Sequence, residues 1–249
     1  MIRKIFILTG YLLLVVFMII TLSFAARKSD NVTCRNIHIE FGENELIQVS
    51  KEEIARLVRD ADKQLMGKEL KQVNADLIEK EVEKHPAVSN AEVFKVIAAD
   101  SLSYNGILGV RVQHREPVVR IMSAAGKYYL DASGKKIPLS SSYTANVLVA
   151  TGDFSEEFAR RELLPFVLYL NSSLFWKAQI EQVHVENGGD VMLTPLVGDQ
   201  VIELGSMESF PEKMRNLKAF YEQILAQNNW DKYKSISLKY KNQVIAKKR

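Results

Sequence analysis

The stretch VRVQHREPV, residues 110–118, decides how the middle of the chain is interpreted. It ends an apolar, β-branched run over residues 106–116, which is typical of a strand. A second run of this kind covers residues 91–97, and a polar segment around residues 100–105, closed by Gly106, separates the two. The sequence therefore predicts two consecutive strands joined by a loop.

Upstream, the sequence predicts one more strand and two helices. Residues 34–41 alternate apolar and polar side chains, as a half-buried strand does. Ser50 and Glu53 have capping-box spacing before a helix whose apolar face consists of Ile54, Leu57, Val58 and Ala61. Asn74 begins a second helix, ended by His85-Pro86, whose apolar face consists of Leu77, Ile78 and Val82. The order is strand, helix, helix, strand, strand.

This order, with two helices on one face of a three-stranded sheet, resembles a POTRA domain. Three motifs make the chain similar to the FtsQ/DivIB family of cell-division proteins. HPAV (85–88) followed by AEV (91–93) resembles the family's helix-to-strand turn, and VRV (110–112) followed by REPV (115–118) resembles its junction between domains. YYLDASG (128–134) resembles the start of its second domain. The resemblance implies an α+β fold: an N-terminal transmembrane helix, a POTRA domain (β-α-α-β-β), and a mostly antiparallel β-domain with flanking helices.

The second half of the chain carries further strand and helix patterns. Residues 127–130 and 137–139 flank Asp131-Ala132-Ser133-Gly134-Lys135, which suits a tight hairpin turn. Strands are expected at residues 146–150, 180–186, 190–195 and 200–204, and the glycine-containing turns near 187–189 and 198–199 indicate an antiparallel meander. Residues 158–170 and 211–226 are expected to be helices, the second with Pro211 in its first turn.

From Ser235 to Ala246 apolar residues dominate the even positions and polar residues the odd ones, which predicts a final strand. ISLKY (236–240) followed by NQVI (242–245) is similar to the family's terminal signature, with Lys239 in place of its arginine. The resemblance implies that this strand lies at or near a sheet edge and accepts a partner strand. The residues implied in partner binding are Lys239, Tyr240, Gln243 and Ile245. The alternative, that Tyr240 and Ile245 pack in the core, stays open from the sequence.

The first thirty residues favour a membrane anchor. Residues 5–26 hold no Asp, Glu, Lys or Arg, and as a helix they are long enough to cross a hydrocarbon core of about 30 Å. Ser23 and Ala25 also fit a signal-peptide cleavage site, but the apolar run exceeds the usual core of such a peptide. We expect a cytoplasmic tail at 1–4, a transmembrane helix at 5–26, a tether at 27–33, a POTRA-like domain at 34–116 and a β-domain with a basic tail at 117–249.

Composition and motifs give no support to an enzyme. Lys and Arg number 33 against 30 Asp and Glu, a balance that argues against a nucleic-acid partner. The four histidines and the many serines form no nucleophile elbow or Ser-x-x-Lys pattern, and no Cys and His cluster suits zinc. Cys34, the only cysteine, is expected to be a buried small side chain. We expect no catalytic residue, cofactor, metal or small-molecule substrate.

The resemblance therefore implies a single-pass inner-membrane scaffold at the division septum, with its bulk outside the cytoplasm. Its partners would be FtsB-like and FtsL-like proteins and other divisome membrane proteins, with further contacts near Val93 to Ile97. Arg115, Glu116 and Pro117 would form the interdomain junction. The alternatives are a POTRA-containing folding helper of outer-membrane protein assembly and a secreted hydrolase.

Overall fold

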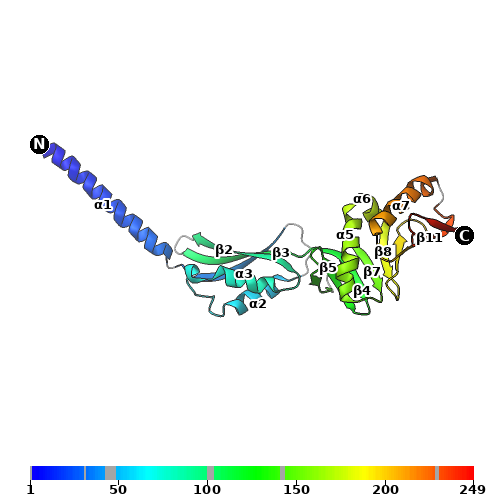
Figure 1. Ribbon diagram of the computed structural model, residues 1–249. Helices are drawn as coiled ribbons and strands as arrows, with labels where there is room; N and C mark the ends of the chain where they lie inside the picture. The colour runs from blue at the N-terminus through cyan, green and yellow to red at the C-terminus, as the bar shows by residue number, and fades with distance from the viewer. Residues whose placement is uncertain (1, 31, 43–48, 100–103, 141–143, 228–229) are drawn as a thin grey trace. The chain divides into compact units, whose positions relative to one another are not determined.

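The computed structural model describes residues 2–30, 32–42, 49–99, 104–140, 144–227 and 230–249. Its chain divides into two compact units, the first ending at His114 and the second running from Arg115 to Arg249. Each unit has its own sheet (Figure 1).

The first unit opens with one long helix, α1 (Ile2–Asp30). It includes residues 27–30, which the sequence had placed in a polar tether; these contain neither Gly nor Pro, the residues that would interrupt a helix. The side chains described in α1, from Thr9 to Ser23, are exposed. Among the described residues, no helix is both long and apolar enough to cross a membrane.

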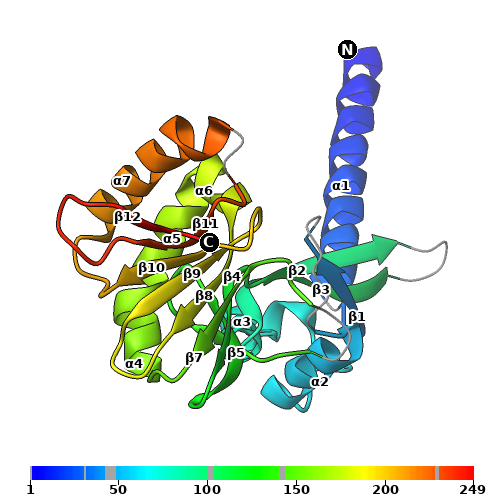
Figure 2. The same cartoon turned by 90° about the vertical axis from the view of Figure 1, so that its right-hand side faces the viewer.

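The rest of the first unit has the predicted order of elements. These are β1 (Cys34–Phe41), α2 (Lys51–Ala61), a short 3-10 turn (Leu70–Gln72), α3 (Ala75–Glu83), β2 (Val88–Ala99) and β3 (Tyr104–His114). The sheet order is β1-β3-β2, with β1 parallel and β2 antiparallel to the central β3. Both helices lie on one face of this sheet (Figures 1 and 2). The predicted loop at 100–105 falls largely on residues outside the described ones.

Side-chain caps fix where the two helices begin. The Ser50 hydroxyl accepts a hydrogen bond from the Glu53 amide, and the Asn74 side chain accepts one from the Leu77 amide. Ile54 and Val58 of α2 and Ile78 and Val82 of α3 are fully buried, as predicted. Leu77, which the sequence placed on the apolar face, is instead 48% exposed. Leu77 directly precedes the buried Ile78, so the two side chains point in different directions around the helix, and only Ile78 faces the core.

Cys34 is fully buried, as expected. Burial raises the pKa of its thiol, which lowers the fraction of reactive thiolate at neutral pH.

The second unit is built on one large mixed sheet, in the order β12-β11-β10-β9-β8-β7-β4-β5-β6. Its strands are β4 (Pro117–Ser123), β5 (Gly126–Asp131), β6 (Lys136–Ile137), β7 (Leu148–Gly152), β8 (Ile180–Val185), β9 (Val191–Pro195), β10 (Val201–Gly205), β11 (Tyr233–Ser237) and β12 (Ile245–Lys248). The predicted antiparallel meander is present in β8, β9 and β10. The pairs β4–β7, β7–β8 and β10–β11 are parallel, so the meander does not extend through the whole sheet.

Parallel pairing requires a crossover connection. β5 and β6 lie in the connection from β4 to β7, and helices lie in the two others, from β7 to β8 and from β10 to β11. The connection from β7 to β8 holds α4 (Glu156–Phe158), a π-helical turn (Ala159–Leu163), α5 (Leu164–Ser172) and α6 (Leu174–Gln179); that from β10 to β11 holds α7 (Phe210–Gln223), followed by a 3-10 turn (Leu225–Gln227). The sequence predicted α5 and α7 but neither β4 nor α6. Helices α5 and α7 pack on the sheet (Figure 2) through buried side chains that include Phe166, Leu170, Met214 and Leu217.

Candidate functional site

The C-terminal residues form a hairpin, where the sequence pattern predicts one continuous strand. Ser237 of β11 lies opposite Ile245 of β12, and the chain between them turns back on itself. Asn242 makes this reversal possible by adopting a φ of 58°, a left-handed conformation that asparagine tolerates better than most residues. The Gln243 amide donates a hydrogen bond to the Tyr240 carbonyl at 3.2 Å, within the turn. The prediction of a single strand is therefore wrong.

β12 is the outermost described strand at one end of the sheet, and β11 anchors it there. Ile236 and Leu238 are buried in the core, and the Leu238 amide donates to the Glu203 carbonyl of β10 at 2.8 Å. The other end of the sheet is β6, which has only two residues. Of the two described terminal strands, β12, with four residues, is the longer.

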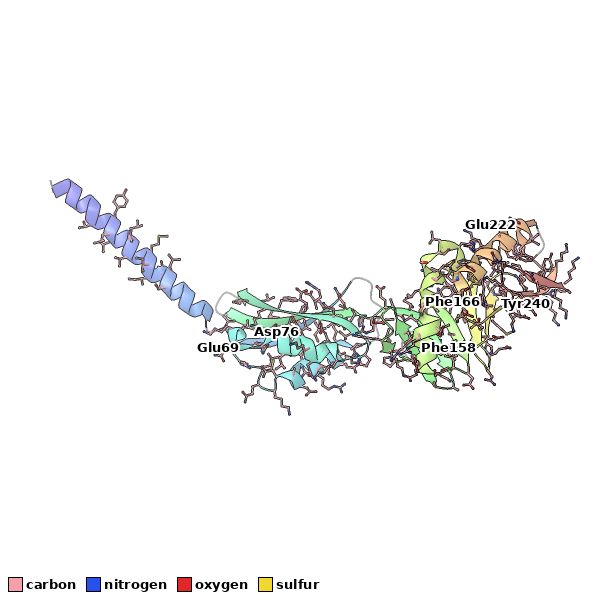
Figure 3. All side chains as sticks on the ribbon, in the orientation of Figure 1. Glu69, Asp76, Phe158, Phe166, Glu222 and Tyr240 are labelled. Atoms are coloured by element: carbon pink, nitrogen blue, oxygen red, sulfur yellow. The ribbon has the colours of Figure 1, made fainter. Side chains whose placement is uncertain are left out.

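Tyr240 and Ile245 are both solvent-exposed, with 60% and 47% of their surface accessible. Gln243 is also exposed. The alternative that Tyr240 and Ile245 pack in the core is thus wrong. Figure 3 marks Tyr240 beside the C-terminal hairpin, whereas the labelled Phe166 belongs to the core of the same unit.

Lys239, the fourth candidate, is already engaged within the unit. Its Nζ lies 2.7 Å from Asp190 Oδ2, and this hydrogen bond raises the pKa of Lys239. Its aliphatic part packs over Gly205, where an added Cβ would lie 3.0 Å from Lys239 Cγ. Lys239 therefore ties the hairpin to the β8–β9 turn, while the other three candidates face solvent.

A groove of about 330 Å³ runs beside the hairpin turn. Residues 238–243 form one wall, and the segment from Ser206 to Asn216, at the start of α7, forms the other. In the second wall Lys213 Nζ donates to the Ser206 carbonyl at 2.7 Å, and burial lowers the pKa of Lys213. The sequence does not predict this wall, because nothing in the helical pattern of α7 shows that it faces the turn.

The predicted junction residues lie at the start of the second unit. Arg115 Nη1 donates to Asp131 Oδ2 at 2.8 Å, and both side chains are buried. Asp131 Oδ1 accepts three more hydrogen bonds, from the Ser133 amide and hydroxyl and from the Lys135 amide. Burial alone would raise the pKa of Asp131, but these hydrogen bonds outweigh it and the pKa is lowered. Pro117 begins β4 opposite Asp131, and Glu116 is exposed.

Within the described ranges, His, Cys, Asp and Glu form no group that could hold a metal ion. His184 Nδ1 lies 2.9 Å from the Thr151 hydroxyl in an exposed contact, and Nε2 of the partly buried His85 lies 3.5 Å from Glu53 Oε1.

Comparison with known families follows this division into units. Residues 32–98 match the family model of the POTRA-like domain, and residues 116–247, more than half of the chain, match that of "FtsQ/DivIB, C-terminal related". The chain belongs to the FtsQ/DivIB family. FtsQ/DivIB proteins are non-enzymatic cell-division proteins, so this chain is a division protein with a POTRA-like domain. All four hairpin candidates lie in the FtsQ/DivIB match. No curated protein matches the chain.

Proposed function

We propose that this FtsQ/DivIB protein is a non-enzymatic inner-membrane scaffold that recruits other divisome proteins to the septum by strand addition at β12. The observation that supports this proposal is the open edge of β12, with Tyr240 and Ile245 exposed beside it. An unpaired strand edge presents amides and carbonyls to which an incoming strand can bond. The partners would be FtsB-like and FtsL-like membrane proteins.

The two parts of such an interface have different roles. Backbone hydrogen bonds along β12 supply affinity for any extended segment, and the side chains of Tyr240, Gln243 and Ile245 select which segment fits. Tyr240 presents a large ring with a polar tip, a residue type that often dominates binding energy at interfaces. Lys247 and Lys248 on the same strand are exposed, and their charge keeps the free edge from pairing with other copies of the chain.

We further propose that α1 is the membrane anchor, with residues 1–4 in the cytoplasm and both folded units on the opposite side. The support is the run of residues 5–26 without a charged side chain, together with the exposure of the side chains described within it. A helix satisfies its own backbone hydrogen bonds, as a lipid environment demands.

The test is a pull-down with the full chain from native membranes in mild detergent, with bound proteins identified by mass spectrometry. We expect the wild type to retain FtsB-like and FtsL-like proteins, and Tyr240→Glu and Ile245→Glu to retain at least about tenfold less, since a charge at a desolvated contact costs several kcal/mol. Leu174→Glu is the matched control, because Leu174 is an exposed apolar residue of α6 in the same unit.

Thermal unfolding of each variant shows whether the unit is intact. Retention of both partners by folded Tyr240→Glu and Ile245→Glu variants would remove β12 as the binding site. A wild type that retains outer-membrane assembly proteins in place of division proteins would favour the folding-helper alternative.

A further inference from the structure

The sheet of the first unit has two edges, formed by β1 and β2. The start of β1 is covered by backbone. The Cys34 amide donates to the Lys68 carbonyl and the Gly67 amide to the Cys34 carbonyl, each at 2.8 Å. β2 pairs with β3 on one side only. The backbone amides of Ala91 and Val93 lie on the other side of β2 and point away from the sheet.

These two outward amides bond to carboxylates of α3. Glu79 Oε1 accepts from the Val93 amide at 2.8 Å, and Glu83 Oε1 accepts from the Ala91 amide at 3.3 Å. Hydrogen bonds to an ionised carboxylate are stronger than those between neutral groups. Any strand adding to β2 here would have to displace both carboxylates.

The match between helix and strand follows from their geometry. Four residues of an α-helix advance about 6 Å, and two residues of a strand advance about 6.7 Å, so successive turns of α3 meet successive outward amides. The Asn74 cap and the buried Ile78 and Val82 hold α3 in this position.

We propose that Glu79 and Glu83 form an edge guard, which prevents a second copy of this chain from adding its β2 strand to the edge of β2. A second copy of the chain is the molecule that we expect to pair with this edge, because each copy presents the same β2 strand. Val96 and Ile97, just beyond the guarded amides, are 39% and 46% exposed, and would give such pairing an apolar contact. The guard acts within the first unit, independently of β12 and of the proposed recruitment.

Hydrogen exchange on the full chain in detergent measures the contact directly. We expect the Val93 amide to exchange at least about tenfold faster in Glu79→Ala than in the wild type, and Ala91 to do so in Glu83→Ala, because each loses a charged acceptor. Glutamine keeps an acceptor oxygen, so Glu79→Gln is expected to stay close to wild type. Glu81→Ala is the matched control, since Glu81 lies on the same helix and pairs with Lys84.

Sedimentation velocity measures what the guard prevents. We expect Glu79→Ala/Glu83→Ala to self-associate at micromolar concentrations at which the wild type and Glu81→Ala do not, and protection of the Leu108 and Val110 amides shows that the sheet is intact. Unchanged exchange at Val93 in Glu79→Ala overturns the proposal. So does a double-alanine variant with fast exchange at both amides that associates no more than the wild type.

Discussion

Gly109 in β3 leaves room for an aromatic ring from the neighbouring strand. An added Cβ would come within 2.2 Å of Phe94 Cε2, and the Arg111 guanidinium lies 5.3 Å from the centre of the same ring. We expect Gly109→Ala to push the ring out of place and lower the free energy of unfolding by about 1 to 2 kcal/mol. Urea denaturation measures the change.

Removing the ring should reverse the sign of this effect. In a Phe94→Ala background Gly109→Ala meets no ring, and alanine is favoured over glycine inside a strand by about 0.5 to 1 kcal/mol. A double-mutant cycle then gives a coupling energy well above zero. If Gly109→Ala destabilises both backgrounds equally, Phe94 is not the cause.

Asp131 makes the stability of the second unit sensitive to acid. Its pKa is lowered in the folded state, so the stabilisation is present above the unfolded pKa, about 3.9, and is lost as the pH falls through the lower folded value. We expect Asp131→Asn to cost about 3 kcal/mol near pH 7, because it removes the carboxylate from a buried ion pair with Arg115. Below about pH 4 the difference from the wild type should shrink.

Thermal unfolding between pH 2 and 7 measures how the stability difference between Asp131→Asn and the wild type changes with pH. Asp199→Asn is a matched control, since Asp199 pairs with Arg249 at an exposed site, where ion pairs contribute little. A constant gap between Asp131→Asn and the wild type across this range would show that the charge of Asp131 is not what stabilises the unit.

The C-terminal hairpin is an element that the sequence pattern did not predict. Residues 235–246 alternate as one strand would, and the turn contains no glycine, the usual sign of a tight hairpin. Asn242 alone reverses the chain, and a single asparagine is too common to mark a turn. Alternation places Tyr240 inward with Ile236, whereas the reversal releases it to solvent.

Replacing Asn242 tests how strongly the turn depends on this residue. Asn242→Gly should leave stability within about 0.5 kcal/mol, whereas Asn242→Ala should cost about 1 kcal/mol, because a left-handed φ strains a residue with a plain Cβ. Hydrogen exchange along β12 is the measurement. Equal exchange in the alanine and glycine variants would show that the turn tolerates another conformation.

Other elements of the second unit were missed for different physical reasons. β4 begins at Pro117, directly after the predicted strand at 106–116, and a proline in the sequence more readily indicates the end of a strand than the start of the next one. α6 is separated from α5 by Ser173, which ends one helix and caps the next, and its six residues are too few for a helical period to show. The first unit was predicted more fully, because its caps and apolar spacings agree with the tertiary contacts.

At the scale of the whole molecule, membrane attachment should depend on α1 alone. Among the side chains that the structure describes, the first buried one is that of Val32, so a variant lacking residues 2–30 should keep both folded units and leave the membrane fraction. Fractionation at high pH, with circular dichroism on the released protein, checks both expectations.

The length of the mature protein shows whether residues 5–26 are a membrane anchor or part of a cleaved signal peptide. An anchor keeps residues 1–26 on the mature chain, whereas cleavage near Ala25 leaves a shorter one, and intact mass spectrometry of the membrane-derived protein separates the two. Loss of this segment would contradict the anchor. The charges that flank the segment could not decide its orientation in the membrane, since both ends are basic.

The sheet order of the first unit also determines how long β1 lacks its neighbouring strand during protein synthesis. β1 pairs with β3, not with its neighbours in sequence, and 73 residues (114 − 41) separate the end of β1 from the end of β3. At about 5 to 20 residues per second, the ribosome leaves β1 without its neighbour for roughly 4 to 15 seconds. During that interval the apolar side chains of residues 34–41, which alternate with polar ones, have no sheet to pack in.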